Sequence, residues 1–218
     1  MVEIYDAHEQ GEVVKKWLQE NGAAIVIGIV VAFGGLFGFK QWQSWQASKQ
    51  QEAYAEFNVM SELLSASQLD AAMDNFQNLQ DQHADSPYAS LAALQMGRAR
   101  VEASQPDLAI NQYRFVMDEG RPTALKTVAR LRLARLLLAQ DKAEEALSLI
   151  ENAPETEGFV AGFAEVRGDI LKTLGRSEDA VTAYQEALDS LEPGVGDRAT
   201  LVLKLEALGV VPDEEGAA

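Results

Sequence analysis

The sequence predicts an all-α protein: one N-terminal transmembrane helix, then a helical repeat domain, then a C-terminal capping helix. Two observations lead to this prediction. Residues 22–39 form a run of eighteen residues without a charge. In the remainder of the chain, an alanine followed four positions later by a bulky apolar residue recurs at intervals of 37, 37 and 34 residues. The first pattern is typical of a membrane span and the second of a helical repeat array.

Residues 1–21 form a short polar N-terminal segment, which we expect to begin a helix. Asp6 and Glu9 resemble a helix-capping box, and apolar residues between positions 13 and 18 recur at helical spacing. We therefore predict a short helix that leads directly into the span.

The span at 22–39 would be ~27 Å long as a helix, about the thickness of a hydrocarbon core. Trp17 precedes it and Trp42 and Trp45 follow it, where indole rings favour the headgroup layer. A cleaved signal peptide is the alternative, but its apolar region would be shorter and a small-residue cleavage site would follow. We predict an uncleaved signal anchor, whose orientation is left open because lysines flank both ends.

Small residues inside the span predict a face for packing against another transmembrane helix. Such residues let two backbones approach closely, although glycine is also simply common in membrane helices. The positions are Ala24, Gly28, Ala32 and Gly35 near one face, with Gly34 and Gly38 as a G-x-x-x-G pair.

Residues 40–58 are predicted to be a helical stalk that merges into the first repeat. Between Lys40 and Pro87 there is neither glycine nor proline, so the backbone has no built-in breaker. We therefore expect a rigid tether between the membrane and the repeats.

The predicted repeat domain covers residues 48–209 and contains three to four copies. A 34-residue period with A-x-x-x-F in the second helix of each helical pair is the signature of tetratricopeptide repeats. Glycine in the first helix is expected where paired helices cross closely, with the aromatic residue filling the gap to the next repeat. The alanine pairs are Ala72 with Phe76, Ala109 with Tyr113, Ala146 with Ile150, and Ala180 with Tyr184.

A final helix is predicted to start near Asp197 and to cap the array. Leu201, Leu205 and Leu208 share one stripe of it, and Gly209 ends it. Pro193 is expected to close the preceding helix, and residues 210–218 are expected to be a disordered acidic tail.

Composition and motifs argue against catalysis and nucleic-acid binding. The formal charge of −16 disfavours a polyanionic partner, and the absence of cysteine excludes thiolate metal sites. His8 and His83 have no neighbouring ligand residues and are expected to be solvated. Phosphate-binding and nucleophile motifs are missing, so we predict no enzyme activity, cofactor, metal or small-molecule substrate, and rank an enzyme site assembled from loops last.

Two sets of residues are candidates for binding a partner protein. The concave surface of such an array is built from first helices, and register places Asn58, Gln95 and Arg132 there. The middle of the domain is basic between residues 98 and 135, which indicates either ordinary surface ion pairs or a patch for an acidic partner. The candidate patch residues are Arg98, Arg130 and Arg135.

The chain as a whole resembles one family. The start MVEIYDAHEQGEVVKKWLQENG, the glycine-rich anchor, the following tryptophans and the segment ADSPYASLAALQMGRA resemble the ancillary subunit of the bacterial SecYEG translocon. The similarity covers residues 1–210.

This resemblance implies a single-pass inner-membrane protein with a cytoplasmic N-terminus and a periplasmic repeat domain. It implies the SecYEG channel, a periplasmic isomerase-like membrane-anchored chaperone and translocating polypeptides as partners, and a role in handing proteins to periplasmic chaperones. The alternative function is an adaptor in envelope assembly or division without translocon contact.

Overall fold

The structure is a computed structural model that describes residues 7–153, 158–192 and 196–211. The described residues form nine α-helices and no strand. The chain divides into two units, one ending at Gln51 and the other beginning at Glu52, and each unit is considered by itself. The all-α fold class predicted from the sequence is confirmed.

Helix α1 (Ala7–Ser65) provides all of the described secondary structure of the first unit. Its apolar side chains are exposed throughout the run at 22–39; Phe37, for example, is 75% exposed. It is the one helix among the described residues that is long and apolar enough to cross a membrane. The capping residue Asp6 lies outside the described residues.

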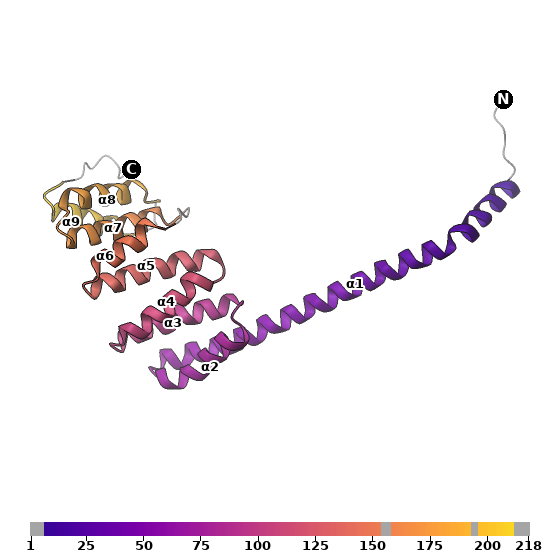
Figure 1. The fold of residues 1–218 in the computed structure, drawn as a ribbon, viewed down its shortest axis with the longest axis horizontal. Coiled ribbons are helices and arrows are strands. Elements are labelled where there is room, and N and C mark those ends of the chain that lie inside the picture. Colours follow the sequence, from indigo (N-terminus) through magenta and orange to yellow (C-terminus); the bar gives the residue numbers. More distant parts are fainter. Residues whose placement is uncertain (1–6, 154–157, 193–195, 212–218) are drawn as a thin grey trace, which may run out of the picture. The chain divides into compact units, whose positions relative to one another are not determined.

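The second unit is built from four consecutive helical pairs and a final helix (Figure 1). The last part of α1, from residue 52, pairs with α2 (Leu69–Gln82). Consecutive helices pack against one another, and first helices also contact the next first helix, as α3 with α5 and α5 with α7. The other pairs are α3 (Pro87–Glu102) with α4 (Pro106–Glu119), α5 (Thr123–Ala139) with α6 (Ala143–Glu151), and α7 (Val160–Thr173) with α8 (Ser177–Asp189).

The recurring alanine and bulky apolar positions lie in the second helix of each pair, and all eight are buried. Two of the aromatic residues pack on glycine in the first helix of their own pair. A Cβ atom added at Gly97 would lie 2.5 Å from Tyr113 Cε1, and one at Gly168 would lie 2.5 Å from the Tyr184 ring. Tyr113 and Tyr184 therefore fill the crossing within a pair, and each also faces the element that follows: Arg132 of the next first helix acts on the Tyr113 hydroxyl, and Lys204 Nζ of the final helix lies 5.6 Å from the centroid of the Tyr184 ring.

The turn between the two helices of each pair contains one residue with a left-handed backbone. At the fourth turn this residue is Gly175, for which a φ of 75° costs little. The first three turns use residues with a side chain, which pay a steric cost in this conformation. They are Ser67, Ser104 and Asp141, with φ of 59°, 58° and 60°.

Helix α9 (Arg198–Glu206) caps the array against α8. The Asp197 side chain accepts a hydrogen bond from the Thr200 backbone N–H (3.1 Å), and Val210 N–H donates to Leu205 O (3.1 Å) after Gly209 turns the chain. Leu201 and Leu205 are buried as predicted. Leu208 is only half-buried because it follows the helix and lies in this closing turn.

The apolar core of the second unit has two parts. The larger cluster runs from Ala53 to α7, where it ends with Val166 and Ile170. The smaller cluster joins α7, through Ala164 and Leu171, to α8 and α9. Helix α7 therefore has one set of side chains in each cluster. Pro193 and the tail from residue 212 lie outside the described residues.

His83 is buried, with 7% of its surface exposed, so the prediction of a solvated histidine is wrong. Its backbone N–H donates to Leu79 O (3.1 Å) and its carbonyl accepts from Ser86 N–H (2.8 Å). These bonds form the tight turn from α2 to α3, which leaves residue 83 between the two helices instead of in an open loop.

Candidate partner-binding surfaces

The predicted groove residues lie on first helices whose side chains contact one another. Gln95 of α3 accepts a hydrogen bond from Ser61 Oγ of α1 (2.8 Å). Arg132 of α5 donates from Nη1 to the carbonyl of Leu94 in α3 (3.2 Å). Asn58 is half-buried. The structure thus joins Gln95 and Arg132 to the neighbouring first helices, and their polar groups contribute to holding the array together.

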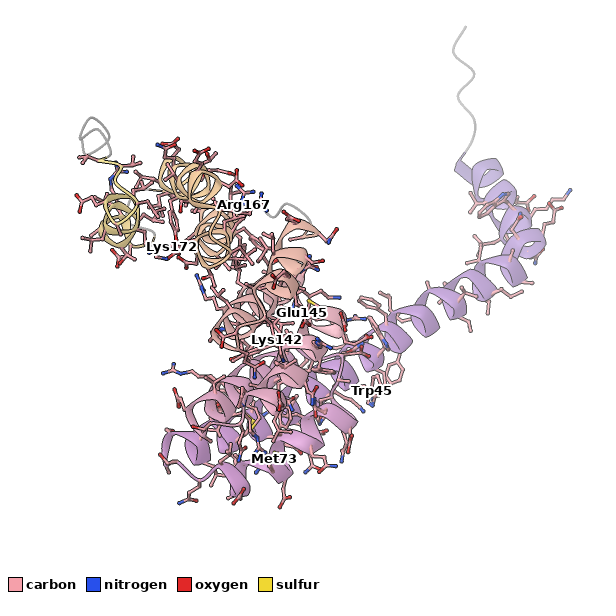
Figure 2. The ribbon with its side chains drawn as sticks, turned by 60° about the vertical axis from the view of Figure 1, so that its left-hand side comes forward. Trp45, Met73, Lys142, Glu145, Arg167 and Lys172 are labelled. Carbon is pink, nitrogen blue, oxygen red and sulfur yellow. The ribbon has the colours of Figure 1, made fainter. Side chains whose placement is uncertain are left out.

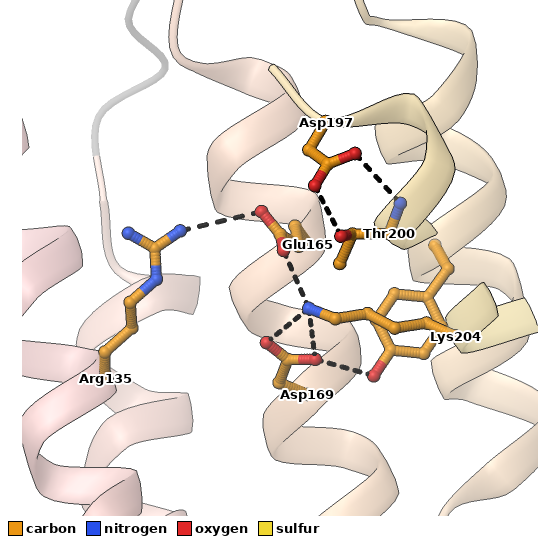
Figure 3. Close-up of polar contacts among 7 residues, drawn as sticks. Arg135, Glu165, Asp169, Asp197, Thr200 and Lys204 are labelled. Carbon is orange, nitrogen blue, oxygen red and sulfur yellow. Dashed lines mark hydrogen bonds and ion pairs between the residues drawn. The ribbon is translucent and has the colours of Figure 1, made fainter. Parts of the chain in front are cut away.

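The same kind of contact continues to the end of the array (Figure 3). Arg135 of α5 lies 3.6 Å from a carboxylate oxygen of Glu165 in α7. Lys204 of α9 donates to Glu165 (2.7 Å) and to Asp169 (2.9 Å), both in α7. Each neighbouring pair of first-position helices is therefore linked by at least one polar side-chain contact.

Two groups in this network have shifted pKa values. Burial raises the pKa of Tyr184, and the hydrogen bond that its hydroxyl donates to Asp169 Oδ1 (2.8 Å) raises it further. Burial lowers the pKa of Lys204, but hydrogen bonds to Asp169 and Glu165 and their negative charges outweigh it, so the net shift is upward. Both residues therefore stay protonated at neutral pH, which keeps α9 linked to α7.

The candidate basic patch is divided among different partners. Arg98 forms an exposed ion pair with Glu102 (2.8 Å), and Arg135 pairs with Glu165. Arg130 instead donates to the backbone carbonyl of Asn152 (3.2 Å). Two further arginines of the basic region are paired with carboxylates: Arg114 with Glu145 at 2.9 Å and Arg121 with Asp85 at 3.5 Å. Arg98 and Arg135 therefore form ordinary ion pairs, whereas the contact of Arg130 within the described part of the chain is to a backbone carbonyl.

A groove that sequence reasoning missed lies between the second helices α4 and α6, with α5 as its floor. It has a volume of about 470 Å³, within the range of known ligand pockets. Leu133 and Leu137 of α5 lie on the floor, and Met117 and Leu149 are on the two walls. The signal that could have found it is Pro154, which predicts that α6 ends early and leaves its neighbours uncovered.

The small residues of α1 are accessible in the first unit. A Cβ atom added at Gly28, Gly34, Gly35 or Gly38 would meet no atom within 4 Å. At the end of the run, Lys49 Nζ lies 5.2 Å from the centroid of the Trp45 ring. Among residues 7–51 no side chain fills the face that was predicted to pack against another helix, and this face stays a prediction.

Metal binding was also considered. In the described ranges 7–153, 158–192 and 196–211, no three His, Asp or Glu side chains are grouped so as to hold a metal ion.

The architecture of paired helices with alanine and aromatic residues at the crossings defines a tetratricopeptide repeat-like protein. The family described as "Tetratricopeptide repeat-like domain" matches residues 15–210, which is most of the chain.

Three similar proteins carry the name "Ancillary SecYEG translocon subunit". The protein from Escherichia coli K12 is 27% identical over 192 residues, 87% of this chain and 91% of that protein. The proteins from Aggregatibacter actinomycetemcomitans and Haemophilus influenzae are 30% and 26% identical over 190 residues, 85% of this chain and 91% of each relative. The chain belongs to the tetratricopeptide repeat-like family of ancillary SecYEG translocon subunits.

Proposed function

We propose that the chain is a non-enzymatic scaffold of the bacterial inner membrane that binds the SecYEG translocon. The observation that carries the proposal is the similarity over at least 85% of the chain to three proteins named as ancillary SecYEG translocon subunits. The family match starts at residue 15, so it includes the whole apolar run at 22–39. In this proposal the N-terminus is cytoplasmic and the repeat domain is periplasmic.

The repeat domain is proposed to hold a periplasmic, membrane-anchored, isomerase-like chaperone close to the channel exit, and to contact translocating polypeptides. The domain offers partners a surface of paired helices stabilised by two apolar clusters. Tethering such a surface raises the effective concentration of its partners near the channel without any new contact. That effect would assist the hand-over of translocated proteins to periplasmic chaperones.

The anchor is proposed to contact transmembrane helices of its partners through Gly28, Gly35 and the neighbouring small residues. These positions are open to close approach, and van der Waals packing of small residues is a principal source of helix association in lipid. The stalk at 40–58 is proposed to keep the repeat domain close to the membrane.

Site-specific photo-crosslinking in native bacterial membranes tests this function. Crosslinkers at Gly28 and Gly35 should capture transmembrane helices of the channel or the chaperone. Crosslinkers at Gln95 and Arg132 should capture a periplasmic chaperone or a translocating chain. If both sets capture envelope-assembly or division proteins and no secretion component, the proposal is wrong and the adaptor alternative replaces it.

A further inference from the structure

The outer face of α9, at the end of the array, is apolar. On its inner face, Leu201 and Leu205 are buried and Lys204 points at α7 (Figure 3). On the opposite side, Leu203 is 63% exposed, more than any other large apolar residue described between residues 52 and 210. The terminal repeat of a solenoid is expected to have a polar outer face, because no further repeat covers it. An exposed leucine at the centre of this face therefore indicates a contact with another chain.

Two alanines extend this apolar face on either side of Leu203. Ala199 lies four residues before it and Ala207 four residues after it, so the three side chains form one line, the outer stripe of α9. Both alanines are exposed, and Ala207 keeps a helical backbone as the C-cap residue. The order alanine, leucine, alanine at equal spacing is the same in both directions. When two such stripes run antiparallel, leucine meets leucine at the centre and each alanine meets an alanine, which allows a close approach.

Opposite charges lie at the two ends of one flank of the outer stripe. Arg198 is the first residue of α9 and Glu206 is the last, ~12 Å apart along the helix axis. If a two-fold axis passes beside Leu203 in an antiparallel pair, Glu206 of one copy and Arg198 of the other lie on the same side, ~3 Å apart along the axis. In a parallel pair these two groups stay ~12 Å apart. The charges therefore favour the antiparallel arrangement, in which they complement each other twice.

Most other basic side chains from α7 to α9 are paired within the array. Arg167 of α7, which Figure 2 labels, pairs with Glu186 of α8. Among the described residues from α7 to α9, the basic side chains that form no ion pair are Lys172, near the end of α7, and Arg198. Glu206 forms no ion pair with a described residue either. Arg198 and Glu206 are thus the charges of α9 that are available to another chain.

We infer that the outer stripe of α9 binds the same stripe of a second copy of this chain in an antiparallel pair. Two-fold pairing repeats each contact, so Arg198 and Glu206 of the two copies form two reciprocal ion pairs around a centre of two Leu203 side chains. A second copy fits better than an unrelated protein, because both the apolar pattern and the charges are complementary to themselves. The inference goes beyond the proposed scaffold function and does not depend on the identity of the channel or chaperone.

The contact is small, so the association should be weak in solution. Two helices of nine residues bury much less than the ~1,200 Å² at the lower end of standard protein interfaces. Anchoring both copies in one membrane raises their effective concentration without any new contact. The pair should therefore form chiefly in membranes, and the test is made there.

The absence of cysteine from the chain allows a direct crosslinking test. Leu203→Cys places a single thiol beside the two-fold axis, where two copies can be joined by a disulfide. The full chain is purified, reconstituted in phospholipid vesicles and treated with diamide, which takes up the two thiol hydrogens as the disulfide forms. Leu108→Cys is the matched control, because Leu108 is an exposed leucine on the second helix α4. Leu203→Cys should give at least about fivefold more dimer. Equal crosslinking of the two variants would overturn the inference.

Charge reversal tests whether the occupant is a second copy. In the Leu203→Cys background, Arg198→Glu or Glu206→Arg turns both reciprocal ion pairs into pairs of like charge. Each change should lower the yield of dimer about tenfold. Circular dichroism should show the same helicity for the two variants as for their parent.

A mixture of the two charge variants is the decisive sample. When one copy carries Arg198→Glu and the other carries Glu206→Arg, both contacts between them join opposite charges again. Vesicles that contain both variants should therefore recover the dimer to within about twofold of the parent yield. If the mixture crosslinks as poorly as each variant alone, or if each variant alone crosslinks like the parent, the antiparallel pairing is wrong.

Two other occupants of the outer stripe are outcomes of the same assay. A variant of Leu203→Cys that ends at Val211 lacks the three carboxylates at positions 213–215. If this shorter variant crosslinks at least about fivefold more than the full chain, the acidic tail occupies the stripe and the inference fails. If Leu203→Cys in native membranes is joined to a different protein and never to itself, the inference also fails. Co-isolation of channel subunits with the natural chain tests the proposed scaffold function separately, because the vesicle assay contains no channel.

Discussion

Gly168→Ala should destabilise the end of the repeat domain by about 2 kcal/mol. The added Cβ would lie 2.5 Å from the ring of Tyr184, which is fully buried and held by its hydrogen bond to Asp169. The ring cannot swing away freely, so we take the upper end of the usual overpacking cost, about 3 kcal/mol. Replacing glycine by alanine within a helix stabilises the helix by about 1 kcal/mol, so the net destabilisation is about 2 kcal/mol.

Gly162→Ala in the same helix is the matched control. Its Cβ would lie 3.5 Å from Leu131 Cδ1, an ordinary van der Waals contact, so only the helix-propensity gain of about 1 kcal/mol remains. The two alanine variants should therefore differ by about 3 kcal/mol, more than a hundredfold in an opening equilibrium. Tryptophan fluorescence would not report this change, because the three tryptophans are at positions 17, 42 and 45.

Hydrogen exchange with mass spectrometry on the full chain in detergent is the suitable assay. Peptides from α7 and α8 should exchange faster in Gly168→Ala and slower in Gly162→Ala than in the natural chain. A Tyr184→Leu background should remove most of the cost of Gly168→Ala, which a double-mutant cycle measures as a coupling energy. Equal protection of the two alanine variants would refute the reasoning that Tyr184 requires glycine at the crossing.

In the first three turns, replacing the left-handed residue by glycine should raise the free energy of unfolding by about 0.5–1 kcal/mol at each position, because a side chain is strained in this backbone conformation. These are Ser67, Ser104 and Asp141. Gly175→Ala should lower the free energy of unfolding by a similar amount. Urea unfolding measures the stability of all four variants. The pKa values of Tyr184 and Lys204 are raised in the folded chain, so their contribution is complete below the unfolded values of about 10 and is lost as pH rises further. The protection of backbone amides in α8 and α9 against hydrogen exchange should therefore be constant from about pH 6 to 9 and decrease above about pH 10. The decrease should be smaller in Tyr184→Phe.

The second helices were the most predictable part of the fold, because their pattern is repeated and local. Alanine at one position permits a close crossing and a bulky residue four positions later fills it, and Ala109 with Tyr113 does both in one turn of helix. All of these residues are buried in the structure. The helix boundary at Ser65 was less visible, since the left-handed residue that follows is Ser67 and not glycine.

The polar contacts could not be predicted from spacing along the chain. Lys204 and Glu165 are 39 residues apart, and only the packing of α9 onto the array brings them to 2.7 Å. The same holds for Arg132, which repeats the position of Gln95 but donates to a backbone carbonyl. His83 was misread because its polar neighbours resemble a loop, whereas the short turn after α2 buries it.

The division of the apolar core at α7 also bears on how the length of such a chain can change during evolution. Val166 and Ile170 close one cluster, and Ala164 and Leu171 open the next. A duplicated pair of helices inserted at this boundary would receive a ready-made surface on each side. Helix α9 brings its own cap at Asp197 and its own closing turn at Gly209, so it could terminate a longer array without being redesigned.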